Sequence, residues 1–162
     1  MDKQQIYAYL NENNIWYEAM EHAAVYNMQQ VAQLTLPHPN AEAKNLFVRD
    51  DKKRNYYMLT VCGDKRVNLK SFRKAHNTRP LTFASSQDLE ELLQLTPGAV
   101  TPLGLLNDAS HRVQLFLDAD FLSDEGLIGV HPNDNTASIW LKTTDLIAIL
   151  RAHASCVQVV QF

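Results

Sequence analysis

Three short stretches of this sequence combine residue types that could carry chemistry. Lys44 stands just before a strongly apolar run, and an ammonium there suits contact with a phosphate or a developing negative charge. Residues 96–105 include two prolines and two glycines, which fix a loop whose backbone can approach a ligand closely. His131 precedes a turn rich in Asn and Asp. Taken singly, these features are more typical of an exposed lysine, a crossover turn and a structural histidine than of a functional site.

Motifs of covalent, metal-dependent or nucleotide-dependent enzymes are absent. The chain has no Gly-rich phosphate loop, no dinucleotide fingerprint, no His-Glu-x-x-His and no Gly-x-Ser-x-Gly. The six histidines and two cysteines show no metal-ligand spacing. We therefore expect no metal and no cofactor. If the chain is an enzyme, we expect it to use positioned water and backbone groups.

Composition favours one globular domain over residues 1–162. Apolar residues make up 46% of the chain and charged residues 20%, which is ordinary globular usage. The N-terminus lacks the basic-then-apolar order of a signal peptide, and no apolar run is long enough to suggest a membrane span. We expect a cytoplasmic protein with reduced cysteines and no membrane contact.

Charge is distributed unevenly along the chain. The formal net charge is −3, which argues against a nucleic-acid partner. Residues 44–79, however, hold eleven Lys and Arg against three Asp, a net +8, and the remainder of the chain carries −11. Such asymmetry predicts a surface that meets phosphates. The alternative is a solvated basic hairpin and helix.

The elements that must position these residues follow from hydrophobic periodicity. The pattern predicts helices near residues 2–13, 28–34, 68–76, from Ser85 or Ser86 onward, and 143–153. It predicts strands near 15–20, 44–49, 56–61, 113–117, 126–130, 137–141 and 157–162, with a hairpin through 50–55. Leu69, Phe72 and Ala75 are expected to face the core, and Thr143 to cap the last helix. The irregular order of helices and strands indicates an α+β fold, with a central sheet or distorted barrel flanked by helices.

Three motifs, in this order and spacing, make the chain resemble a known family. They are Ala41-Glu42-Ala43-Lys44-Asn45-Leu46-Phe47, Gly98-Ala99-Val100-Thr101-Pro102-Leu103-Gly104, and His131-Pro132 followed by Asn135-Thr136. Together they are similar to the YbaK/prolyl-tRNA synthetase-associated editing domain family. The likeness is greatest to its free-standing PrdX/ProX-type Ala-tRNA(Pro) deacylases, and it spans nearly the whole chain.

The resemblance implies a hydrolase that corrects a charging error. Alanine is smaller than proline, and a synthesis site cannot reject a smaller amino acid by size, because a methylene or two yields only about 1–3 kcal/mol of discrimination. A second site that admits alanine and excludes proline would hydrolyse the aminoacyl ester, releasing alanine and free tRNA. Apolar residues of the 31–36 segment would form walls that keep proline out.

The resemblance also implies roles for individual residues. Lys44 would lie near the terminal adenosine and its phosphate, and Gly98 and Pro102 would belong to a loop that holds the amino acid and orients water. His131 would be a pocket wall or hydrogen-bonding partner, completing the catalytic set.

Three further positions are implied as substrate-binding. Asn45 would help to orient the terminal nucleotide, and Thr101 and Gly104 would line the same loop.

Alternatives remain open at this stage. The implied substrate is mischarged tRNA(Pro), with transient contact to prolyl-tRNA synthetase or an elongation factor as a further expectation. A sister activity of the family removes cysteine from tRNA(Pro), and another aminoacyl-tRNA is also compatible. A module that binds tRNA or a synthetase without catalysis is the alternative from another class of protein.

Overall fold

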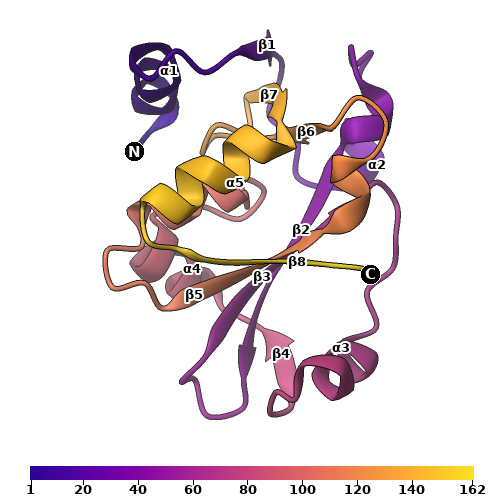
Figure 1. The fold of residues 1–162 in the computed structure, drawn as a ribbon, viewed down its shortest axis with the longest axis vertical. Helices are drawn as coiled ribbons and strands as arrows, with labels where there is room; N and C mark the ends of the chain where they lie inside the picture. Colours follow the sequence, from indigo (N-terminus) through magenta and orange to yellow (C-terminus); the bar gives the residue numbers. More distant parts are fainter.

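The computed structural model describes residues 1–162 and contains helices and strands in mixed order (Figure 1). The α-helices are α1 (Lys3–Glu12), α2 (Met28–Val31), α3 (Leu69–His76), α4 (Ser86–Leu93) and α5 (Thr143–Ala152). The strands are β1 (Tyr17–Glu21), β2 (Ala43–Asp50), β3 (Tyr56–Cys62), β4 (Leu81–Phe83), β5 (Val113–Asp118), β6 (Leu127–Val130), β7 (Ala137–Lys142) and β8 (Cys156–Val160). Short 3₁₀ turns are η1 (Pro39–Ala41), η2 (Pro102–Asn107) and η3 (Ala119–Leu122). None of the helices combines the length and the apolar character that crossing a membrane requires.

The larger sheet has five strands in the order β4-β2-β3-β5-β8. The β2–β3 pair is the antiparallel hairpin expected from the sequence, and β3, β5 and β8 run parallel. Side chains alternate between the two faces of this sheet. Phe47, Met58 and Leu115 belong to the main core, whereas Val48 and Tyr57 belong to a second cluster.

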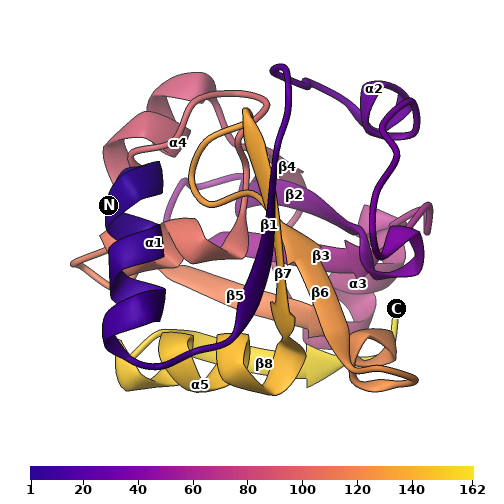
Figure 2. The same ribbon diagram turned by 90° about the horizontal axis from the view of Figure 1, so that it is seen from above.

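A smaller sheet in the order β1-β7-β6 lies across the larger one (Figure 2). Its residues Ile128, Val130, Ile139 and Leu141 join the same core as the inner face of the larger sheet, together with residues of α1, α4 and α5. The two sheets meet through a single bridge between residue 42 and Gly129 and do not close into a barrel, so the barrel alternative is wrong. The α+β fold with a central sheet flanked by helices is confirmed.

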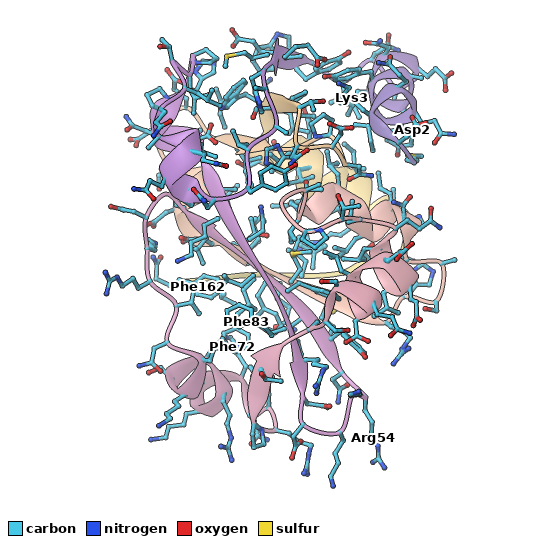
Figure 3. All side chains as sticks on the ribbon, turned by 180° about the vertical axis from the view of Figure 1, so that it is seen from behind. Asp2, Lys3, Arg54, Phe72, Phe83 and Phe162 are labelled. Atoms are coloured by element: carbon cyan, nitrogen blue, oxygen red, sulfur yellow. The ribbon has the colours of Figure 1, made fainter.

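The outer face of the larger sheet is covered by α3 and the C-terminus. Phe72 of α3 is buried against Phe116, with ring centroids 4.9 Å apart, and stacks on Phe162 at 6.1 Å (Figure 3). The expectation that Phe72 faces the core is therefore confirmed. Ala75 is exposed, so its expected core position is wrong; the helix contacts the sheet over too narrow a stripe to cover it.

Other differences from the expected elements have local causes. The helix expected near 28–34 closes after one turn at Val31, although Asn27 caps it as expected. Thr143 does not cap α5, because it is the first helical residue and its hydroxyl donates to the carbonyl of Phe121 at 2.8 Å. Strand β4 was not predicted, since three residues are too few to show an alternating pattern.

Asp50 organises the β2–β3 turn. Its buried carboxylate accepts hydrogen bonds from the backbone amides of Lys52, Arg54 and Asn55 at 2.9–3.2 Å, and from the side-chain amide of Asn55 at 2.8 Å. We expect Asp50→Ala to lower the free energy of unfolding by about 2 kcal/mol, because several donors lose one shared acceptor. Urea denaturation measures this. Asp64→Ala, at an exposed turn, is the matched control, and an equal effect of both substitutions would contradict this role for Asp50.

Candidate active site

A cavity of about 180 Å³ opens where five parts of the chain meet. They are α2 with the segment leading into it, the beginning of β2, the loop before η2, the end of β6 and the beginning of β7. The residues that line it are Val25, Tyr26, Asn27, Met28, Val31, Glu42, Ala43, Lys44, Asn45, Gly98, Val100, Gly129, Val130, His131 and Ser138. Of the seven site residues expected from the sequence, Lys44, Asn45, Gly98 and His131 are brought together here.

Lys44 reaches the cavity from β2 and is held by its neighbours. Its Nζ donates to the backbone carbonyl of Lys65 at 3.3 Å. Lys65 is in turn fixed by ion pairs, with its Nζ 2.8 Å from Asp118 and 2.6 Å from Asp120. The carboxylate of Asp118 is fully buried. The Lys44 ammonium therefore keeps hydrogen-bonding capacity for a ligand while its position is restricted, since an ammonium has three donors.

Gly98 occupies a position that only glycine can fill. Its φ is +89°, and a Cβ there would lie 2.7 Å from the ring of Tyr26 and 3.2 Å from the side-chain amide of Asn135. A side chain would therefore be strained and would also push two neighbours of the cavity aside. The loop backbone reaches the cavity because this residue has no side chain.

Thr101, Pro102 and Gly104 do not line the cavity. All three are buried. Thr101 Oγ1 donates to the carbonyl of His131 at 2.8 Å, so it fixes the neighbouring wall. A Cβ on Gly104 would lie 2.5 Å from Leu95, which places Gly104 at a close contact within the core.

Asn45 ties the loop to the sheet. Its Nδ2 donates to the carbonyl of Val100 at 3.2 Å, and its Oδ1 accepts from the buried Thr60 hydroxyl at 2.7 Å. Both ends of the amide are thus occupied within the chain. This arrangement positions the loop against β2 and leaves Asn45 as part of the cavity wall.

His131 presents one free ring nitrogen. Its Nδ1 lies 2.8 Å from the carbonyl of Ala137, so Nδ1 is the donor and Nε2 has no partner within the chain. Burial lowers the pKa of His131 below its ordinary value, although the Ala137 contact acts in the opposite direction. The ring is therefore neutral at pH 7, and Nε2 is available to accept a hydrogen bond.

A second pair of polar side chains borders the same wall. His22 Nδ1 lies 2.8 Å from the carbonyl of Ala23, and its Nε2 lies 2.9 Å from Ser138 Oγ. With Nδ1 as the donor, the Ser138 hydroxyl donates to Nε2. The rings of His22 and His131 are 6.2 Å apart.

Glu42 is a site residue that sequence reasoning missed as a functional candidate. It is the only carboxylate that lines the cavity, and its Oε1 accepts from Trp140 Nε1 at 3.1 Å. Burial raises the pKa of Glu42 to about 7, although the Trp140 contact lowers it. The available signal was spacing, because Glu42 and Lys44 are two residues apart on an extended segment and share a face.

The fold is one already known from other proteins. It resembles a crystal structure described as a trans-editing enzyme for prolyl-tRNA synthetase, with a TM-score of 0.71 and 19% sequence identity over 99% of this chain and 96% of the other. Residues 22–149 match the aminoacyl-tRNA editing domain family. This chain belongs to that family, as the sequence motifs predicted.

Two similar proteins have names that refer to prolyl-tRNA editing or to prolyl-tRNA synthetase. Prolyl-tRNA editing protein ProX of Acetoanaerobium sticklandii is 33% identical over 159 residues, covering 98% of this chain and 96% of its own length. Prolyl-tRNA synthetase associated domain-containing protein 1 of Mus musculus is 32% identical over 142 residues, covering 83% of this chain and 81% of its own. The expected likeness to the free-standing ProX type is confirmed.

The raised pKa of Glu42 makes stability depend on pH in a defined direction. The folded state holds this proton more tightly than the unfolded chain does. The resulting contribution is complete below pH 4.5 and is lost as pH rises through about 7. As pH rises over this range, we expect the native chain to lose up to about 3 kcal/mol of unfolding free energy that the Glu42→Gln variant, which cannot titrate at this position, does not lose. Urea titrations at several pH values test this; a constant difference between the two proteins would contradict it.

Proposed function

We propose that this chain hydrolyses the ester bond of tRNA(Pro) mischarged with alanine, acting as a separate protein from the synthetase. Membership of the aminoacyl-tRNA editing domain family supports the reaction class. The name of the A. sticklandii relative, a prolyl-tRNA editing protein, supports tRNA(Pro) as the substrate.

One observation of the site carries the proposal. Lys44, Gly98 and His131 are far apart in the sequence but line a single small cavity. An ammonium can stabilise developing negative charge, backbone groups can hold the acyl group, and a neutral imidazole can accept a hydrogen bond from the attacking water. A module that only binds tRNA would need a basic surface but no such convergence.

The chemistry assigns a role to each group. Water adds to the ester carbonyl carbon and gives up a proton, the bond from that carbon to the ribose oxygen breaks, and the ribose oxygen takes up that proton and leaves as a hydroxyl. His131 Nε2 accepts a hydrogen bond from the water, and the Lys44 ammonium stabilises the negative charge at the terminal nucleotide or on the ester oxygen. The loop at Gly98 supplies backbone groups that hold the amino acid. Thr101 and Asn45 act as positioning residues.

The cavity walls support alanine as the amino acid removed. Val25, Met28, Val31, Val100 and Val130 give the cavity an apolar lining, which suits a methyl side chain and limits a ring. Val31 is the part of the 31–36 segment that reaches this wall. Leu34 and Leu36 border an adjoining depression instead.

The basic segment supports contact with the rest of the tRNA. Lys65 and Arg79 are in ion pairs with acidic residues. Exposed cations remain at the β2–β3 turn, including Arg54 (Figure 3), and on α3. The eight residues of β2 span about 25 Å between the cavity and that turn. These cations would therefore contact phosphates of the tRNA body rather than the aminoacyl end. Transient contact with prolyl-tRNA synthetase or an elongation factor fits the same role in translation.

A panel of charged tRNAs tests the function. We expect purified protein to release alanine from Ala-tRNA(Pro) at least about 100-fold faster than proline from Pro-tRNA(Pro), because exclusion by shape and unfavourable packing adds to the discrimination of a methylene or two. Release of labelled amino acid measures both rates. Cys-tRNA(Pro) and Ser-tRNA(Pro), assayed in the same way, show whether the protein prefers another substrate. No release from any of them at high protein concentration would favour the non-catalytic module.

The role of Lys44 is tested by removing its charge. We expect Lys44→Ala to lower kcat/KM for Ala-tRNA(Pro) by about 10²–10³-fold, because one donor to developing charge is lost. Unfolding curves of the variant should match those of the native chain. Lys142→Ala removes an exposed lysine and should leave kcat/KM unchanged. Equal rates for native chain and Lys44→Ala would contradict this assignment.

A further inference from the structure

The cavity contains one carboxyl side chain that has no role in the reaction described above. Glu42 lies beside Lys44 and His131 among the lining residues. The substrate of the proposed function carries a positive charge at its reacting end, the α-ammonium of the amino acid next to the ester carbonyl. A group that recognises this ammonium would distinguish an aminoacyl end from any other ester.

The backbone of Glu42 is fixed from two sides. Its carbonyl accepts from the amide of Gly63 at 2.7 Å, and residue 42 forms a parallel bridge with Gly129 of β6. The side chain is fixed as well, because Oε1 accepts from Nε1 of the fully buried Trp140 at 3.1 Å. The carboxyl group is therefore held in one place at the cavity wall.

Gly129 provides the space for this arrangement. A Cβ at residue 129 would lie 2.6 Å from Trp140 Nε1 and 2.8 Å from Glu42 Oε1. Any other residue would separate the carboxyl group from the indole or displace both. The glycine permits the contact without itself adopting a strained backbone.

A structural role alone does not account for a carboxylate here. A buried indole N–H needs a single acceptor, and the neutral amide of glutamine supplies one. The second carboxyl oxygen, Oε2, has no partner in the chain. Burial raises the pKa of this group to about 7, so the site makes its charge costly unless a cation is present. A bound cation would reverse that effect.

We propose that Glu42 binds the α-ammonium of the aminoacyl group and so orients the ester within the cavity. The inference rests on the proposed function. Glu42 and Lys44 are two residues apart on one strand face, which separates their Cα atoms by about 7 Å. The ammonium end of the substrate lies at Glu42, and the nucleotide end lies towards Lys44.

A substrate without the charge provides the test. L-lactyl-tRNA(Pro) carries a hydroxyl in place of the ammonium and is otherwise nearly the same size and shape as L-alanyl-tRNA(Pro). We expect Glu42→Gln to lower kcat/KM for the alanyl ester by about 30-fold or more, because a charge-assisted hydrogen bond is lost. The same variant should change kcat/KM for the lactyl ester by less than about threefold.

Controls separate recognition from folding and from net charge. Glutamine retains an acceptor for Trp140, so the unfolding curve of the variant at low pH, where Glu42 is protonated, should resemble that of the native chain. Glu12→Gln removes an exposed carboxylate at the end of α1 and should leave kcat/KM unchanged for both substrates. If Glu42→Gln slows both esters by the same factor, the residue acts on the water or the ester itself and the proposal is overturned. No effect on either ester overturns it as well.

A binding measurement keeps this inference distinct from the proposed function. Stable amide analogues, 3′-amino-3′-deoxyadenosine carrying alanine or lactate, can be titrated calorimetrically into both proteins. The native chain should prefer the alanyl analogue, and Glu42→Gln should lose the preference. A Glu42-dependent preference without ester hydrolysis would sustain the inference and reject the function. Ester hydrolysis with no such preference would sustain the function and reject the inference, and a chain that shows neither rejects both.

Discussion

The hydrogen-bonded register between β2 and β3 is the constraint on which the cavity depends. Lys44 pairs with Val61, and Asn45 pairs with Thr60. A slip of one residue would turn every side chain of β2 to the opposite face. Lys44 and Asn45 would then exchange faces, and Asn45 would lose its bond to Thr60. The alternation of core residues along both strands makes such a slip costly, because Phe47 and Val48 would exchange between two separate clusters.

Single polar contacts join the segments that surround the cavity to one another. Asn45 holds the loop at Val100, Thr101 holds the backbone at His131, and Trp140 holds Glu42. Each contact satisfies a group that would otherwise be buried without a partner. The same bonds therefore stabilise the fold and align segments that are 30 to 98 residues apart in the sequence. Mutations at these positions act on the site through geometry.

Much of the fold followed from local pattern. Apolar alternation and turn residues located the β2–β3 hairpin, and helical spacing located α1, α3, α4 and α5. The short elements β4 and α2 could not be located well, because one turn or three residues carry too little periodic signal. The separation into two sheets could not be predicted either, because it depends on the long-range pairing of β1 with β7.

The site was only partly predictable for a related reason. Family motifs led to Lys44, Gly98 and His131, yet they did not separate residues that face the cavity from the buried residues Thr101, Pro102 and Gly104. Orientation within a loop depends on tertiary contacts that local sequence does not encode. Glu42 lay inside a motif, but its significance arises from burial beside Trp140 and from the absence of a side chain at Gly129.

Trp140 gives this protein an internal optical signal. The chain has two tryptophans. Trp16 is 51% exposed, whereas Trp140 is fully buried and bonded to Glu42. An indole responds to nearby charge, so the fluorescence of Trp140 reports the ionisation of Glu42 and the arrival of a cation beside it. Replacing Trp16 with Phe leaves one tryptophan, which is buried and bonded to a residue that lines the cavity.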